Sequence, residues 1–267
     1  GNVSLRVLPT ERPDAWEVQG RGEMALSVLI ESMRREGFEL TIGKPQVVTK
    51  EIDGKTYEPY DHMIIDVPAE HQGAVTQLMA NRKGQMTSMS NAGSGDWVRM
   101  EFDVPSRGLI GYQSEFLTDT RGTGLMNRLF HGYAPYKGPI ASRHTGVLIS
   151  NGDGTAVAYA LWNLEDRGPM MIEPGVPVYQ GMIIGEHTRG NDLEVNVLKG
   201  KQLTNIRAAG KDEAVRLTNP IVMTLEKAMS YIADDELLEV TPKSIRLRKR
   251  HLDPNERKRA SKQAEAS

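Results

Sequence analysis

The spacing of apolar residues at the start of the chain predicts two strands, a helix and a third strand. Three short apolar runs are typical of strands: residues 3–8, 16–19 and 38–42. Residues 23–35 are predicted to be helical and to stop at Gly37, because apolar side chains recur at i, i+3, i+4 and i+7: Leu26, Leu29, Ile30 and Met33. A three-stranded sheet with one helix is a poor independent unit, so residues 1–43 are expected to be part of a ferredoxin-like domain that begins upstream.

The next stretch, residues 44–137, has the complete pattern of such a unit. Strands are predicted at 45–52, 56–67, 85–90, 97–104 and 123–133, and helices at 69–83 and 106–120. The first two strands are joined by Asp53-Gly54, a strong short-range hairpin signal. After the leading strand the order is β-α-β-β-α-β, which predicts a ferredoxin-like domain.

From residue 138 to 267 the pattern changes to short apolar strands about every ten residues, which is typical of a β-barrel-like domain. A hairpin is predicted from 145–150 and 155–162, and further strands at 176–186, 193–198, 236–240 and 244–249. A helix is predicted over 221–233, and Asp253-Pro254 is a helix start for the charged tail. The predicted fold class is therefore α+β and multi-domain, with partial and complete ferredoxin-like units before a β-barrel-like C-terminal domain with a basic tail.

Composition places the protein among ordinary globular chains. Its 267 residues are 39% hydrophobic and 25% charged, and no apolar run reaches the roughly 18 residues that a membrane helix needs. With no cysteine there is neither a disulfide framework nor a thiolate metal site, which fits a reducing compartment. We expect a cytoplasmic protein that does not enter membranes.

The net charge of −2 hides two basic stretches. Residues 196–211 contain four Lys or Arg and no acid in a Gly- and Asn-bearing segment that is predicted to be a loop. Residues 243–262 contain nine Lys or Arg and two acids. An acid-free basic loop can follow a phosphate backbone, and alternate arginines on a strand would present guanidinium groups on one face.

These stretches supply the candidate RNA-binding residues: Lys199, Lys201, Thr204, Asn205, Arg207, Lys211, Arg246, Arg248 and Arg250. For the loop, the alternative is a solvated flexible segment. For the tail cations Arg257, Lys258 and Arg259, an unspecific solubilising role and a binding role are equally supported.

Enzyme chemistry finds little support in the sequence. The only Gly-Lys-Thr, at Gly54, lacks the glycine that a phosphate-binding loop needs five residues earlier, and it lies in a predicted hairpin. The six histidines are scattered, with no pair at the i, i+4 spacing that lets a helix hold a metal. No catalytic residue and no metal ligand is therefore assigned.

Three sets of motifs follow one another along the chain. The first is GRGE at 20–23, LSVLIE at 26–31 and MRREGFEL at 33–40; the second is EPY at 58–60, RKG at 82–84 and VPSRGLIG at 104–111; the third is GVLISNG at 146–152 and KQLTNIRA at 201–208. Together they resemble the BipA/TypA translational GTPases, relatives of elongation factor G, over essentially the whole chain. Met24-Ala25 departs from the Leu-His of the family pattern, and residues 136–144 match poorly and receive no function.

The resemblance implies the carboxyl-terminal half of a ribosome-binding GTPase that acts in ribosome assembly and stress-adapted translation. The first two segments would correspond to the third and fifth domains of elongation factor G. The third would be the domain peculiar to the family, which reaches ribosomal RNA and the acceptor arm of an A-site tRNA. GTP and magnesium are expected in a G domain that this sequence does not contain, and neither DNA nor a membrane is expected as a partner.

Two other interpretations remain open at this point. The β-α-β-β-α-β unit could be a stand-alone hydrolase of the acylphosphatase type, which needs a loop arginine and an asparagine facing a phosphate; Arg107 and Asn127 are the candidates. The chain could instead be an oligomerising regulatory module.

Overall fold

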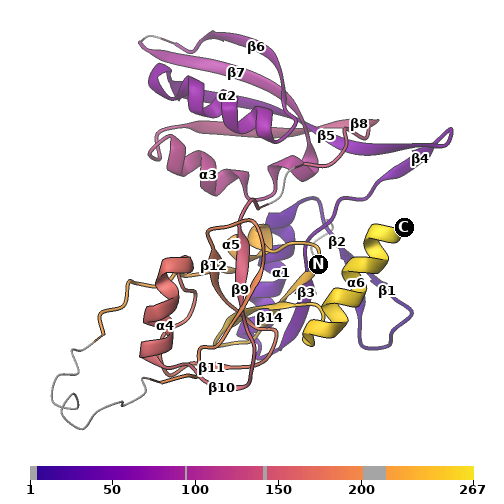
Figure 1. The fold of residues 1–267 in the computed structure, drawn as a ribbon. Helices are drawn as coiled ribbons and strands as arrows, with labels where there is room; N and C mark the ends of the chain where they lie inside the picture. The colour runs from indigo at the N-terminus through magenta and orange to yellow at the C-terminus, as the bar shows by residue number, and fades with distance from the viewer. Residues whose placement is uncertain (1–4, 94, 141–142, 201–214) are drawn as a thin grey trace. The chain divides into compact units, whose positions relative to one another are not determined.

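The structure is a computed structural model that describes residues 5–93, 95–140, 143–200 and 215–267 (Figure 1). The chain divides into two compact units. Unit 1 combines Gly1–Lys44 with Arg143–Ser267, and unit 2 is Pro45–Ser142. The described residues form helices and several sheets of two to five strands. This confirms the predicted α+β multi-domain class.

Unit 2 has the element order that the sequence predicts. Its elements are β4 (Lys50–Ile52), β5 (Lys55–Pro68), η1 (Ala69–His71), α2 (Gln72–Asn81), β6 (Gln85–Asn91), β7 (Trp97–Pro105), η2 (Ser106–Leu109), α3 (Tyr112–Asp119) and β8 (Leu125–Pro135). β5 pairs antiparallel with β7 on one side and β8 on the other, and β6 pairs antiparallel with β7. This is the ferredoxin-like arrangement.

Helices α2 and α3 cover one face of this sheet (Figure 1). Val75 and Met79 of α2 and Phe116 of α3 pack against alternate strand residues, among them Ile65 and Phe102. Because side chains alternate across a strand, the residues between these point to the uncovered face. The core therefore lies on one side of the sheet only.

The structure corrects the predicted lengths of several unit 2 elements. The strand expected over 45–52 is confined to β4, and the two predicted helices are each divided into a short 3₁₀ turn followed by an α-helix. Ile110 is extended and Gly111 has a φ of 73°, so the backbone leaves the helical region between η2 and α3. The Asp53-Gly54 hairpin is confirmed, with φ values of 53° and 75°.

Unit 1 is assembled from both ends of the chain. Its first part contains β1 (Arg6–Pro9), β2 (Trp16–Gln19), α1 (Glu23–Arg35) and β3 (Leu40–Gly43). Its second part contains β9 (Gly146–Ser150), β10 (Gly154–Thr155), α4 (Ala158–Leu164), η3 (Glu165–Arg167), β11 (Pro177–Val178), β12 (Ile183–His187), β13 (Leu193–Val195), α5 (Leu225–Tyr231), β14 (Glu236–Val240), β15 (Ile245–Lys249) and α6 (Pro254–Ala266).

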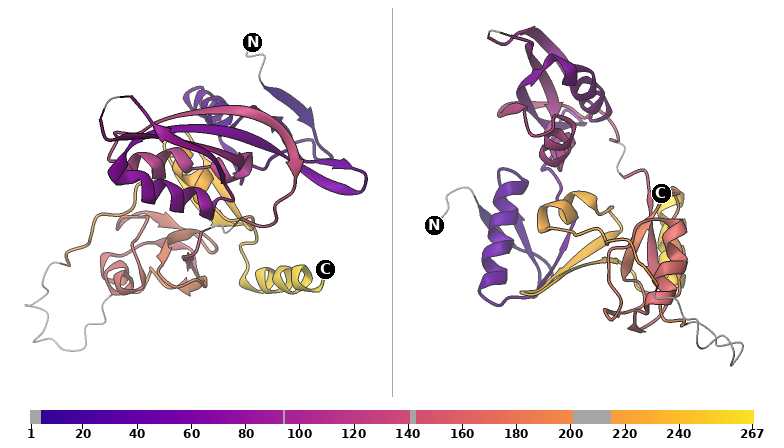
Figure 2. Two further views of the ribbon diagram at one scale, coloured as in Figure 1. Left: turned by 90° about the horizontal axis from the view of Figure 1, so that it is seen from above. Right: turned by 90° about the vertical axis from the view of Figure 1, so that its left-hand side faces the viewer.

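A three-stranded sheet of order β15-β14-β3 links the two parts (Figure 2). Ile30 of α1 and Met229 of α5 belong to one buried cluster with Leu238 and Val240 of β14. The Ser27 hydroxyl donates to the Met229 sulfur at 3.4 Å, so the two helices are in direct contact. Helix α1 and strands β14 and β15 lie where the sequence predicts them. The division into 1–43, 44–137 and 138–267 stays a prediction; within unit 1, β3 pairs with β14.

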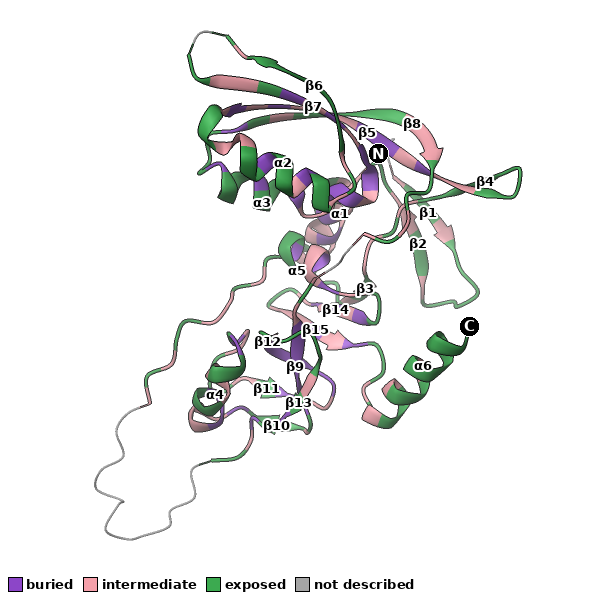
Figure 3. Cartoon of the chain, turned by 45° about the horizontal axis from the view of Figure 1, so that its top comes forward, coloured by how far each residue is buried: buried purple, intermediate pink, exposed green. Residues whose placement is uncertain are grey.

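The predicted hairpin of 145–150 with 155–162 is wrong. β9 is buried at all five positions and lies between β12, to which it is antiparallel, and β13, to which it is parallel (Figure 3). Residues 158–164 form α4 instead of a strand. Their apolar positions also fit a helix, because Val157, Ala160, Leu161 and Leu164 have i, i+3, i+4 and i+7 spacing.

Other parts of unit 1 also differ from the predictions. The strand expected over 176–186 is divided into β11 and β12, which belong to different sheets, and the strand expected over 193–198 is only β13. The helix expected over 221–233 is only α5, which begins at the Thr224 cap whose hydroxyl accepts from the Lys227 amide. The described strands of 143–267 form small open sheets, and no closed barrel is found among them.

The uncovered face of the unit 2 sheet carries a titratable cluster around His62. The His62 ring lies between two carboxylates of β7, with Nδ1 2.8 Å from Asp103 and Nε2 3.3 Å from Glu101. The hydrogen bond to Asp103 raises the pKa of His62, against a smaller opposing effect of burial and with further support from Glu101. The folded state therefore holds the imidazolium proton more tightly than the unfolded chain does.

We predict that His62→Gln lowers the stability of unit 2 in a pH-dependent manner. Because the folded-state pKa is raised, the contribution of His62 is fully present below about pH 6.5, the ordinary value. It is lost as pH rises through the folded-state pKa. Hydrogen exchange of β5 and β7 amides in both proteins measures the difference. An equal difference at pH 5.5 and pH 9 would contradict this assignment, and His144→Gln in unit 1 is the control.

Candidate RNA-binding surface

The β14-β15 hairpin determines how the candidate arginines of the tail are presented. Arg246 lies opposite Glu239 and Arg248 opposite Leu237. Leu247 and Lys249 are buried on one side of β15, whereas Arg246 and Arg248 point to the other side and are partly exposed. The predicted alternation of the strand is therefore found, while RNA binding by these arginines stays a prediction.

Arg246 is partly neutralised by its neighbour across the hairpin. Its Nη2 lies 3.9 Å from the Glu239 carboxylate, and its Nη1 donates to the Ser244 hydroxyl at 3.2 Å. Glu239 also accepts a hydrogen bond from the Tyr179 hydroxyl. With its side chain 35% exposed, Arg246 can meet a phosphate only by sharing its charge with Glu239.

Among the described residues, the guanidinium groups of Arg248 and Arg250 donate to backbone carbonyl oxygens only. Arg248 donates to the carbonyl oxygens of Lys249 and Arg250, each at 3.1 Å. Arg250 is exposed and donates to the Asp234 carbonyl at 3.3 Å. Neither guanidinium forms an ion pair with a carboxylate of the described residues, so these two arginines are the stronger candidates on the hairpin.

Lys249 has a different role, which the sequence did not reveal. Its side chain is 2% exposed, and its Nζ lies 2.7 Å from Glu236, 3.0 Å from Asp235 and 2.6 Å from Asp192. Burial alone would lower the pKa of Lys249, but the carboxylates of Glu236 and Asp192 outweigh burial and raise it. The ammonium group of Lys249 therefore forms ion pairs inside unit 1 and is not available to a ligand.

The same carboxylate, Glu236, holds a second cation. Its side chain is fully buried and accepts two hydrogen bonds from Arg143, at 2.7 and 3.0 Å, and one from the Ala233 amide at 2.8 Å. Burial would raise the pKa of Glu236, but the hydrogen bonds from Arg143 and the charge of Lys249 lower it. The acids of β14 are the sequence signal for this cluster, because they oppose the cations of β15 in register.

The second basic segment is only partly described. Lys199 is exposed, and no ion-pair partner is found for it among the described residues. Lys201, Thr204, Asn205, Arg207 and Lys211 lie outside the described residues, so their assignment to RNA stays a prediction.

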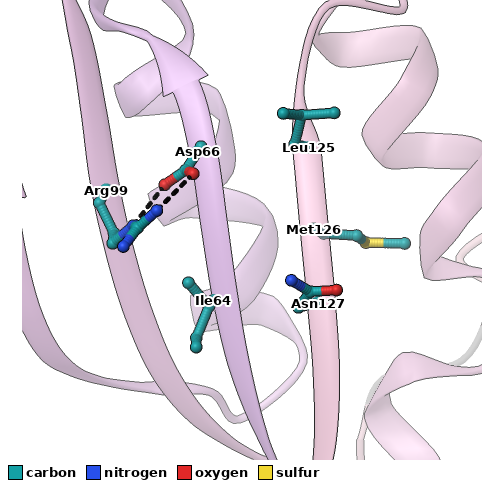
Figure 4. A pocket seen from close by; sticks show the side chains of 6 residues that line it. All are labelled: Ile64, Asp66, Arg99, Leu125, Met126 and Asn127. Atoms are coloured by element: carbon teal, nitrogen blue, oxygen red, sulfur yellow. Dashed lines mark hydrogen bonds and ion pairs between the residues drawn. The ribbon is translucent and has the colours of Figure 1, made fainter. Parts of the chain in front are cut away.

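The two residues required by the hydrolase hypothesis lie in different environments. Arg107 forms an ion pair with the buried Glu58 carboxylate and donates to the Gly138 carbonyl. Asn127 lies opposite Ile64 on the uncovered sheet face, in a shallow pocket that also contains the Asp66–Arg99 ion pair (Figure 4). Arg107 does not line that pocket, and its charge is already compensated by Glu58. The described residues thus give no phosphate site that combines the two.

The described residues do not fit a guanine nucleotide with its magnesium ion. Gly54-Lys55-Thr56 lies at the β4-β5 hairpin, not between a strand and a helix. No group of three or more His, Asp or Glu suited to a metal occurs in the part of the chain that the structure describes. None of the described helices is long and apolar enough to cross a membrane.

In comparisons with known proteins, two regions match family models and nearly the whole chain matches longer relatives. Residues 145–254 match the model of the TypA/BipA C-terminal domain, and residues 55–144 match that of the elongation factor G C-terminus. The large ribosomal subunit assembly factor BipA of Escherichia coli (strain K12) is 55% identical over 262 residues, which cover 98% of this chain and 43% of the relative. The corresponding proteins of Bacillus subtilis (strain 168) and Haemophilus influenzae are each 53% identical over 98% of this chain, covering 43% and 42% of their own lengths.

We predict that Glu236→Gln destabilises unit 1 by about 3 to 5 kcal/mol, because it leaves the buried Arg143 and Lys249 without their shared charge. Hydrogen exchange of β14 and β15 amides measures the loss of stability. The matched control is Glu239→Gln on the same strand, whose side chain is 24% exposed and whose pair with Arg246 is long; a change under about 1 kcal/mol is expected there. Equal effects of the two substitutions would refute a special role for Glu236.

Proposed function

Since this chain belongs to the TypA/BipA family of translational GTPases, we propose that it is the part of such a protein that binds the ribosome during assembly of the large subunit. The observation that carries the proposal is the identity of 53–55% over 98% of the chain to proteins named large ribosomal subunit assembly factor. The chain spans about 43% of the length of those relatives. Hydrolysis of GTP with magnesium is assigned to a G domain elsewhere in the protein, and a role in stress-adapted translation is part of the same proposal.

In this proposal the chain acts by docking and not by chemistry. Its C-terminal domain contacts ribosomal RNA and the acceptor arm of an A-site tRNA in the cytoplasm. The exposed Lys199 and Arg250 and the partly exposed Arg248 support the contact, because none of them forms an ion pair with a carboxylate of the described residues. Lys201, Thr204, Asn205, Arg207 and Lys211 would extend the contact along the loop, and Arg246 would add a shared charge. Contacts of this kind give affinity that depends on salt and little on sequence.

The first test removes the loop cations. We predict that replacing Lys199, Lys201, Arg207 and Lys211 with Ala leaves folding intact and weakens binding to large ribosomal subunits. The slope of log K against log salt should flatten by about 0.7 to 0.9 for each phosphate that the variant no longer binds. An unchanged slope would reject phosphate binding by these side chains.

A second arm tests the hairpin arginines with a matched control. The double variant Arg248→Gln with Arg250→Gln should flatten the slope further. The variant Lys55→Gln with Arg121→Gln removes two exposed cations from unit 2 and should leave the slope unchanged, although its net charge is the same. If both double variants flatten the slope equally, net charge and not a located surface governs the binding.

A further inference from the structure

Helix α6 (Pro254–Ala266) has no buried residue, so packing of apolar side chains does not explain how it is held (Figure 3). Its start is capped by Asp253, whose carboxylate accepts from the Asn255 amide at 2.7 Å, and Pro254 occupies the first turn. These features define where the helix begins. Its direction relative to the rest of unit 1 requires a different contact.

Arg257 supplies that contact. Its side chain, 15% exposed, forms an ion pair with Glu194 of β13, and its Nη1 donates to the carbonyl oxygens of His251 and Leu252, each at 2.8 Å. Glu194 is 36% exposed and lies next to β9 in the parallel pairing of β13. Arg257 therefore attaches the first turn of α6 to β13 of unit 1.

The other three cations of α6 are left to the solvent. Lys258, Arg259 and Lys262 are exposed, and none forms an ion pair within the described residues. Lys258 and Lys262 are four residues apart and therefore lie on one face of the helix, where like charges repel unless an anion lies between them. These three cations of α6 thus form no ion pair with any described acid, including Glu256 and Glu265 of the same helix.

The partner that fits this face is a polyanion with a hydrophilic surface. A helix that enters a membrane surface needs Leu, Phe or Trp on its opposite face, and residues 254–266 contain none of these. A phosphate backbone requires only spaced cations, which the exposed face of α6 provides.

We propose that α6 is an additional RNA-binding element, held by the Arg257–Glu194 ion pair so that Lys258, Arg259 and Lys262 meet successive phosphates. The inference rests on the proposed function, and it assigns the tail a definite contact besides the loop and the β14-β15 hairpin. Arg257 is a positioning residue in this arrangement, since its guanidinium forms an ion pair with Glu194.

The decisive experiment uses two substitutions that each remove one negative charge. General electrostatics predicts that Glu194→Gln and Glu265→Gln both strengthen RNA binding slightly. If Glu194 positions α6, Glu194→Gln weakens binding to large ribosomal subunits and to protein-free ribosomal RNA, whereas Glu265→Gln, at the far end of the helix, does not. Equal strengthening by both substitutions would overturn the proposed positioning.

A triple variant tests the cationic face itself. Lys258→Gln, Arg259→Gln and Lys262→Gln together keep helix propensity, which circular dichroism can verify, and should flatten the salt slope by about two to three. Binding of the wild-type protein to anionic phosphatidylglycerol vesicles as tight as to RNA would overturn the assignment to RNA. An unchanged triple variant, with the Arg248/Arg250 variant impaired, would reject the α6 contact alone. A wild-type chain that does not bind ribosomes at low salt would reject the proposed function itself.

Discussion

The buried carboxylate of Glu236 holds together segments of the second part of unit 1, 143–267, that are far apart in sequence. It joins Arg143, where the chain enters the second part of the unit, to Lys249 at the end of β15, and Lys249 in turn reaches Asp192 before β13. A buried ion is costly unless its partners satisfy it, and here Arg143, Lys249 and the Ala233 amide do so. The network therefore fixes the relative positions of three chain segments as well as their charges.

This arrangement changes what the basic sequence of the tail means. Of the nine cations between 243 and 262, Lys249, Arg246 and Arg257 are paired with acids that precede that segment: Glu236, Asp235 and Asp192, then Glu239, and finally Glu194. Counting the cations along the sequence overestimates the attraction for RNA, because some of them form ion pairs with acids of unit 1. The remaining exposed cations are fewer, but their directions are defined by the ones that are paired.

Local patterns predicted the elements of the fold better than their partners. The spacing in 23–35 and the Asp53-Gly54 turn depend on neighbouring residues alone, and both were confirmed. The pairing of β9 with β12 and β13, or of β3 with β14, depends on residues more than 30 positions apart, which no local period encodes. For 155–162 the apolar pattern was compatible with both a strand and a helix, and burial of Ala160 and Leu161 decided for the helix. The same limit applies to the candidate site: alternation predicted the exposed side of Arg248, but not the burial of Lys249.

The charge of each unit explains why RNA binding must be local. Unit 2 contains nine Lys or Arg and eleven Asp or Glu, and unit 1 contains 24 of each, so neither unit attracts a polyanion by its net charge. At physiological salt, charges more than about 8 Å apart are largely screened from each other at the surface. A phosphate then responds to the cations nearest to it and not to the sum over the unit. Internal acids that bind inward-facing cations do not weaken such a surface, because they hold the hairpin and α6 in place while leaving the outward cations free. In a nearly neutral protein, this separation of inward from outward charge is the physical means of producing a phosphate-binding face.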